Sequence, residues 1–239
     1  MPAATGVLAV WNDLEPGHEP EFEAWYRLQH GPERLRVAGF REARRYAASG
    51  GSPRYCAFYW LDSAAVLATA QYRERLANPT PWTRRMMGRF RAMARTPCRI
   101  AVDHGAGMGG AMCFVAGFGR NEAPVAAPAM DATFAAALED PACIRLQLWE
   151  CDAEIAALDN PEARLRAGGD RLAHWIVCIE AAEPDAAARH ADALAQRLRE
   201  AAPHVELLRA PVYRLLWRMH AAEAPLPSTR TQWSAATDA

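Results

Sequence analysis

An aromatic run at helical spacing leads up to a histidine and comprises Phe22, Trp25, Tyr26, Gln29 and His30. This spacing predicts an amphipathic helix. The helix is expected to end near His30, because Gly31-Pro32 follows, although a further turn to Val37 is an alternative. An imidazole at that place can exchange a proton with a substrate near neutral pH. The alternative reading of His30 is a structural histidine that caps the last helical carbonyls.

A predicted β-hairpin carries an arginine and several tyrosines. Its strands are expected at 40–48 and 54–61, because residues 49–53 have the composition of a turn. Alternation puts Arg44 and Tyr46 on one face, which we take to be the inward face. A guanidinium and a phenol at such a place can hold a carboxylate or an enolate. Ordinary cross-strand packing is the alternative for each aromatic residue.

Two further positions could contribute to the same site. Asn12 follows Trp11 at the end of the first predicted strand, where it either donates to an oxyanion or begins the turn. The resulting hypothesis has His30, Arg44 and Tyr46 as catalytic residues. The expected substrate-binding residues are Trp11, Asn12, Tyr26, Tyr55, Tyr59 and Tyr72.

The composition removes several kinds of chemistry. All 27 basic residues are arginine, so neither a lysine Schiff base nor a lysine general base is available. The histidines show no metal-binding spacing, and no dinucleotide, Walker or nucleophile-elbow motif is present. The six cysteines form no CxxC pair and are expected to be reduced thiols. We therefore expect no metal and no cofactor. Haem stays open through one axial ligand, with His174 as the candidate and a core histidine as its alternative.

Charge and hydropathy give no reason to expect nucleic acid or a membrane as a partner. The net charge is −1, and no apolar run reaches the length of a membrane span. The first residues lack the basic region of a signal peptide, so a cytoplasmic protein is expected. Residues 1–110 carry 15 arginines against 10 acidic residues, whereas the remainder carries 12 against 18. Opposite charges of this kind would favour docking of the two halves.

The predicted elements follow a β-α-β-β-α-β order twice, which is the split βαβ pattern. Expected elements of the first half are strands at 6–11, 40–48, 54–61 and 99–104, and helices at 22–30, 62–76 and 82–94. Expected elements of the second half are strands at 111–118, 144–149, 172–180 and 205–219, the last with a bend at Pro211, and helices at 130–138 and 185–201, with a connecting segment at 158–167. The predicted domains are 1–106 and 107–220, joined through the glycine-rich segment 105–110, with a flexible tail at 221–239 that Trp233 could dock.

One such repeat covers only one face of its sheet with helices, and its other face needs a cover. Apolar residues on both faces of several strands indicate that the second repeat supplies this cover. The expected fold is therefore α+β, with two tandem ferredoxin-like repeats that form a barrel within one chain. The space between sheet and cover is a natural pocket for a small molecule.

The stretch Phe22–His30, followed by Gly39-Phe40 and Arg44-Arg45-Tyr46, resembles the EthD-like branch of the dimeric α–β barrel superfamily. Proteins of this branch carry a helix that reads roughly F-x-x-W-Y-x-x-x-H before a strand. The resemblance covers about the first hundred residues by motif and the second half only by element order. It implies the barrel fold and a pocket near His30. The second half lacks the motif, so one pocket of this type is expected where a homodimer would have two.

The superfamily includes cofactor-free monooxygenases, cyclases, decarboxylases, isomerase-like enzymes and haem enzymes. Three classes of function follow from the resemblance. The first is a cofactor-independent lyase, cyclase or isomerase that uses acid–base chemistry on a small apolar, aromatic or polyketide-like acid. The second is an oxidoreductase of the same fold, either a cofactor-free monooxygenase or a haem protein. The third is a non-catalytic binding or stress-related protein. Because the duplication would satisfy the usual dimer interface, a monomer or weak homodimer is expected.

Overall fold

The computed structural model describes residues 3–118, 127–166 and 168–227. The strands are β1 (Gly6–Leu14), β2 (Phe40–Ala48), β3 (Tyr55–Leu61), β4 (Phe90–Gly105), β5 (Ala111–Phe118), β6 (Cys143–Cys151), β7 (Trp175–Ala181), β8 (Glu206–Arg209) and β9 (Tyr213–His220). The α-helices are α1 (Glu19–Trp25), α2 (Gly31–Leu35), α3 (Ala70–Ala77), α4 (Pro81–Met87), α5 (Ala127–Ala137), α6 (Ala153–Ala156) and α7 (Pro184–Ala201). Other helical turns are the π-turn η1 (Tyr26–His30) and the 3₁₀ turns η2 (Ala64–Ala68), η3 (Pro161–Leu165) and η4 (Ala221–Glu223).

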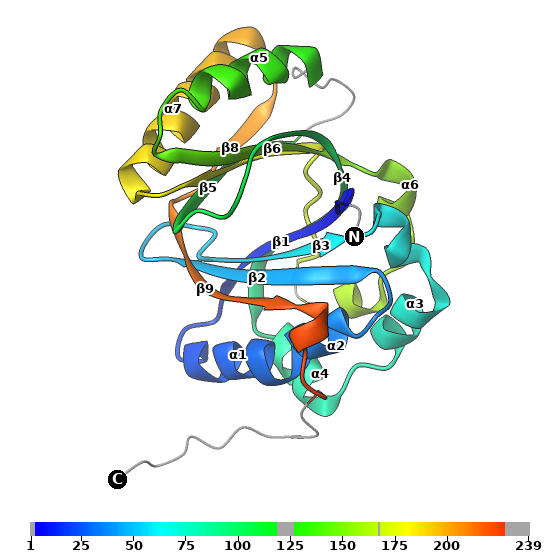
Figure 1. Cartoon of the computed structure of the whole chain (residues 1–239). Helices are drawn as coiled ribbons and strands as arrows, with labels where there is room; N and C mark the ends of the chain where they lie inside the picture. The colour runs from blue at the N-terminus through cyan, green and yellow to red at the C-terminus, as the bar shows by residue number, and fades with distance from the viewer. Residues whose placement is uncertain (1–2, 119–126, 167, 228–239) are drawn as a thin grey trace.

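An eight-stranded antiparallel barrel lies between two layers of helices (Figure 1). The strand order is β7-β6-β4-β1-β3-β2-β9-β5, and pairing of β5 with β7 closes the ring, while β8 adds to β5. Helices α1–α4 lie on one side of the barrel and α5 and α7 on the other (Figure 1). The predicted α+β class and the barrel are therefore confirmed.

The strands of each half are neighbours in the barrel. The first half contributes β4-β1-β3-β2 and the second contributes β6-β7-β5-β9. The two halves meet where β4 pairs with β6 and where β2 pairs with β9. The domain limits at 106 and 107 stay a prediction.

Three apolar cores correspond to the three layers. Strand β1 shows why its residues form a strand buried on both faces, because its side chains alternate between two of these cores. Leu8 and Val10 pack under the first helix layer, whereas Val7, Ala9 and Trp11 point into the barrel. The third core lies under α5 and α7, whose apolar residues recur at helical spacing.

Two helix predictions are wrong at their ends. The predicted helix at 82–94 ends at Met87, and the chain from Phe90 onward is strand β4. Phe90 of β4 pairs with Leu14 of β1, so pairing with a distant strand overrides the local helical spacing. The predicted helix at 62–76 is divided at Thr69 into η2 and α3.

The second half follows its prediction more closely. Strand 111–118 is confirmed, and the predicted strand at 205–219 divides around Pro211 into β8 and β9. The predicted strand at 172–180 begins at Trp175 instead. Residues 221–223 of the predicted tail form η4, and Trp233 lies outside the described residues. None of the described helices is both long and apolar enough to span a lipid bilayer.

Ion pairs link the halves with the predicted sense of charge in three places. Arginine comes from the first half and glutamate from the second in Arg34–Glu162, Arg44–Glu180 and Arg99–Glu150. Two arginine links have the opposite sense, Glu42–Arg218 and Asp103–Arg145. All six cysteines are free, and Cys151 alone among them is not buried.

Candidate functional site

The predicted site residues fall on opposite faces of the same strands. Tyr59 is opposite Ala43 in the β2–β3 register, and Arg44 is opposite Phe58. Directly opposite residues share a face, so Tyr59 lies under the first helix layer while Arg44 points into the barrel. The expectation that the arginine and the hairpin tyrosines form one site with His30 is therefore wrong.

His30 lies at an enclosed cavity of about 30 Å³ between the first helix layer and the outer face of the barrel. This volume has room for about one or two water molecules. Among the predicted residues, Tyr26, Tyr59 and Tyr72 line the cavity with His30. The remaining lining residues are Leu8, Val10, Arg34, Met87, Phe90, Met93, Arg95, Glu162 and Arg166.

A π-turn sets the direction of His30. Helical structure continues through α2 to Leu35, so the helix does not end at Gly31-Pro32 and the alternative of a further turn toward Val37 is the one observed. Pro32 has no N–H and its ring would collide with a carbonyl one turn earlier. The chain widens instead, and the Gly31 N–H donates to the carbonyl of Tyr26, five residues back. Such π-turns occur frequently at functional sites.

His30 is a buried neutral imidazole. Burial, together with the positive charges of Arg34, Arg166 and Arg45, lowers the pKa of His30 well below 6.5. Its ring stacks on Trp25, whose indole N–H donates to Thr83 Oγ1 at 3.2 Å. Within the described residues, His30 Nδ1 has no hydrogen-bond partner. A buried ring nitrogen without a partner is available to a ligand.

The phenols of Tyr26 and Tyr59 are protonated. Burial raises the pKa of Tyr26 to about 12 and also raises the pKa of Tyr59. The Tyr59 hydroxyl is buried and, in the described part of the chain, has no partner. The Tyr72 hydroxyl accepts a hydrogen bond from Arg95 at 3.1 Å. The cavity therefore offers two polar atoms without partners, His30 Nδ1 and Tyr59 Oη.

Arginine residues make the cavity electropositive. Arg34 pairs with Glu162, which reaches the cavity from η3 in the second half of the chain. Burial acts to lower the pKa of Arg34, but the Glu162 carboxylate outweighs this effect and the pKa is raised. Arg166 pairs with Asp170, and its Nη1 lies 3.3 Å from Met87 Sδ.

This arrangement suits the formation of an anion from a weak acid. A neutral imidazole can accept a proton, and fixed guanidinium groups stabilise the negative charge that the proton leaves behind. Both effects are strong in a buried site because water does not screen them.

Sequence reasoning missed Arg34, Glu162 and Arg166. Arg34 lies four residues after His30, so it would have been placed on the same helix face if the helix had been continued through Pro32. Glu162 and Arg166 lie in a segment that was predicted only as a connection. The sequence holds no signal that brings them to this cavity, because the contact spans 128 residues.

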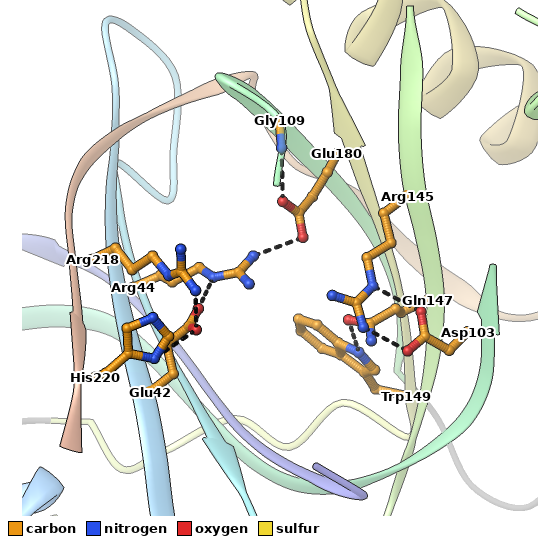
Figure 2. A network of polar contacts seen from close by, with 10 residues as sticks. All are labelled: Glu42, Arg44, Asp103, Gly109, Arg145, Gln147, Trp149, Glu180, Arg218 and His220. Atoms are coloured by element: carbon orange, nitrogen blue, oxygen red, sulfur yellow. Dashed lines mark hydrogen bonds and ion pairs between the residues drawn. The ribbon is translucent and has the colours of Figure 1, made fainter. Parts of the chain in front are cut away.

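The barrel interior holds Arg44, another predicted catalytic residue, in a network of polar contacts (Figure 2). Arg44 pairs with Glu42 and, at 2.9 Å, with Glu180, and its guanidinium lies 4.1 Å from the Trp60 ring centre. Figure 2 shows Glu180 also accepting from the Gly109 N–H, at 3.1 Å. Arg44 thus connects the two halves and is fully paired.

The opposite wall of the barrel carries a second part of this network (Figure 2). Arg145 pairs with Asp103 at 2.6 Å, and the Trp149 indole donates to Gln147 Oε1 at 3.1 Å. Gln147 Nε2 is buried and has no partner among the described residues. The Arg145–Asp103 pair connects β6 to β4.

The remaining predicted residues are packed away from His30. Tyr46 and Trp11 belong to the barrel core, where Trp11 lies 4.8 Å from Phe114 between ring centres. Asn12 lies within β1 rather than at a turn, and its Nδ2 donates to the carbonyl of Asp13 at 2.8 Å. Tyr55 packs against the buried Arg45 guanidinium under α1.

His174 is the candidate haem ligand, and the histidine spacing predicts no metal site. His174 is exposed and lines neither the His30 cavity nor the barrel core, so the site expected for an axial ligand does not fit a haem. Over the described ranges, no cluster of three or more histidine, cysteine or acidic side chains is placed to hold a metal ion.

No family model matches this sequence, and no curated protein is similar to it in sequence. Solved structures do share its fold. An anthrone oxidase-like protein superposes with a TM-score of 0.59 and 11% identity, over 95% of this chain and 97% of that chain. A proposed monooxygenase of Fusobacterium nucleatum gives a TM-score of 0.54 and 9% identity, over 92% and 96%.

A proposed monooxygenase of Lactobacillus acidophilus gives a TM-score of 0.50 and 8% identity, over 90% of this chain and 94% of that chain. The chain therefore has the α+β barrel fold of these proteins. At such low identity the likeness concerns the fold alone.

Proposed function

We propose that this protein is an enzyme that uses His30 as a base on a small apolar or aromatic organic acid, without a cofactor. One observation carries the proposal: His30 Nδ1 is buried, belongs to a neutral imidazole and has no partner within the described residues. Packing alone would not require a buried polar atom without a partner, since such an atom costs free energy. A cavity at His30 also favours an enzyme over a protein with a solid core there.

The proposed reaction begins with proton transfer. In the tautomer with its proton on Nε2, His30 Nδ1 carries a lone pair that takes a proton from a C–H or O–H group beside a carbonyl or aromatic ring. The electrons of the broken bond move onto the substrate oxygen, giving an enolate or phenolate. Arg34 and Arg166 stabilise that charge. Return of the proton to another atom completes an isomerisation or cyclisation, and loss of a leaving group completes a lyase reaction.

Oxidation is the second candidate function. The fold is shared with an anthrone oxidase-like protein and with proposed monooxygenases, and this likeness favours it. The first step would be the same, and the anion would then react with dioxygen as the oxidant. His30 and the arginine residues would have unchanged roles.

Binding and oxygen uptake separate these possibilities. Native mass spectrometry against a small library of phenolic and polyketide-like acids should identify a bound acid. Turnover of that acid without oxygen consumption supports the lyase, cyclase or isomerase reading, and oxygen consumption supports the oxidase. A bound acid that is never converted would indicate a non-catalytic binding protein. A visible absorption spectrum of freshly purified protein tests for haem.

The order of strands supports a proposal about origin. The order β4-β1-β3-β2 is repeated in the second half as β9-β5-β7-β6, with the last, first, third and second strand of each half in the same succession. We infer that the chain is a tandem duplication of a ferredoxin-like repeat, related to the EthD-like branch through the Trp25-Tyr26 and His30 motif of its first half. Residues 1–106 expressed alone should then form a homodimer by light scattering, and a stable monomer would count against the duplication.

A further inference from the structure

A buried ion pair closes the His30 cavity from the other half of the chain. Arg34 comes from α2, and Glu162 comes from the turn η3. Their side chains are only 4% and 7% exposed. A buried pair of this kind contributes little net stability, because both charges lose their hydration. Stability alone therefore gives no reason for placing Glu162 at this cavity.

The segment around Glu162 separates two hollows. On its inner side, Glu162 and Arg166 line the cavity of about 30 Å³. On its outer side, Asp159 and Pro161 line a groove of about 420 Å³ against α3. Helix α3 borders both hollows, since Tyr72 lines the cavity and five residues of α3 line the groove, namely Ala70, Arg73, Glu74, Leu76 and Ala77. Outward movement of Pro161–Arg166 would join the groove to the cavity.

Two arginines of this segment pair with acidic residues that flank it in the chain. Arg164 pairs with Asp159 at 2.7 Å, and Arg166 pairs with Asp170. Within the described residues, its charged contact to the body of the protein is the Arg34–Glu162 pair, supplemented by Arg166 on a methionine sulfur. Leu165 adds apolar packing against the first core, so within the described residues Glu162 is the ionic attachment of the segment to the body.

Charge limits what can take the place of that carboxylate. Arginine does not lose its proton in proteins, and Arg34 without Glu162 would be a buried charge without a partner. Such a charge is strongly unfavourable. Among the described residues that line the cavity, Glu162 is the one carboxylate, whereas Arg166 is positive and His30 is neutral. An incoming carboxylate fits because its two oxygens match the guanidinium fork.

We propose that Pro161–Arg166 is a lid over the active site, and that Glu162 holds Arg34 until the carboxylate of the substrate replaces it. This inference rests on the proposed function of the His30 site. It specifies the substrate as an organic carboxylate whose apolar body occupies the groove beside α3. Neutral analogues of the same shape do not open the lid, because they leave Arg34 without a counter-charge.

The test compares benzoate with its neutral analogue benzamide by isothermal titration calorimetry. The variant Glu162→Gln keeps the shape of the side chain and removes the competing charge. It should bind benzoate about tenfold tighter than the unaltered protein, since the ligand no longer displaces a carboxylate. Benzamide should bind weakly to both. Glu150→Gln removes another ion pair between the halves, at Arg99 and away from the cavity, and should leave benzoate affinity unchanged.

A double variant and a thermal measurement keep the test valid if Glu162→Gln loses stability. Arg34→Gln with Glu162→Gln removes both charges and should fold without any gain in benzoate affinity. If Glu162→Gln is too unstable for calorimetry, benzoate should raise its melting temperature more than that of the unaltered protein. The lid is overturned if the unaltered protein and Glu162→Gln bind benzoate equally, or if neither binds it. It is also overturned if benzamide gains as much affinity as benzoate.

The lid and the proposed function fail in different ways. If benzoate shows no gain but substitution of His30 abolishes turnover, the lid alone is wrong. If benzoate shows the gain but turnover survives without His30, the catalytic role is wrong and the carboxylate site stands.

Discussion

The imidazole of His30 stacks on the indole of Trp25, with ring centres 4.3 Å apart, although five positions separate the two residues in the chain. In a regular α-helix, residues five apart point about 140° away from each other. The π-turn adds one residue to the turn and brings both rings onto the same face. The orientation of the proposed base thus depends on the widened turn.

Gly31→Ala should disturb this turn. A Cβ atom at Gly31 would lie 2.8 Å from the Tyr26 carbonyl oxygen and 2.9 Å from Trp217 Cη2. Neither backbone nor a packed indole yields easily, so we expect a loss of about 1–3 kcal/mol in the free energy of unfolding. Gly50→Ala is the control, because nothing lies within 4 Å of its Cβ position. Urea denaturation of both variants gives the comparison, and equal stabilities would contradict the packing described at Gly31.

Acid should destabilise the protein through His30. Burial and three arginine residues hold the pKa of His30 well below 6.5 in the folded state, so only the unfolded state binds this proton at mildly acid pH. The contribution to stability is present above pH 6.5 and falls as the pH drops below it, by at most about 1.4 kcal/mol per pH unit. Urea denaturation at pH 5 and pH 7 should show a smaller difference for His30→Gln than for the unaltered protein. Identical pH dependence in the two proteins would show that His30 is not held neutral.

Arg44 should act on stability rather than turnover. Arg44→Met leaves the buried Glu180 carboxylate without its guanidinium partner, while Glu42 keeps Arg218, and should cost about 3–5 kcal/mol. Arg145→Gln breaks the more exposed pair with Asp103 and should cost about 1 kcal/mol or less. Denaturation curves test both values. Loss of turnover in a stably folded Arg44 variant would return Arg44 to the catalytic residues.

The sequence predicts the barrel well because its strands carry strong local patterns. Val7, Ala9 and Trp11 alternate with Leu8 and Val10, and both faces are apolar, which a strand between two cores requires. Strand register is a different matter. Alternation placed Arg44 and Tyr46 on one face correctly. Only the pairing of Tyr59 with Ala43 shows that the tyrosines of the partner strand, Tyr55 and Tyr59, belong to the other face.

The sequence predicts the site only for residues that lie close together in the chain. His30 and Tyr26 lie on one helical segment, and their spacing drew attention to them. Glu162 reaches the same cavity from the other half, and a contact across so long a stretch depends on closure of the whole barrel. The widened turn at Gly31-Pro32 also follows from an interaction between neighbours that helix rules treat as a stop signal.

The closed ring of strands bears on assembly. Strands β2 and β4, the edges of the first half, are paired with β9 and β6 of the same chain. No barrel edge in the described structure is therefore left for a partner strand. We expect a monomer or a weak dimer by light scattering, and a stable hexamer or larger ring would contradict this.

The central claim is that the bare Nδ1 of His30 takes a proton from the substrate, and His30→Gln tests it most directly. The variant keeps a polar side chain of similar length but removes the base. Turnover of the acid found by the ligand screen should fall about 10²–10⁴-fold, while the melting temperature changes little and the acid still binds. Full turnover in a folded His30→Gln variant would contradict the account.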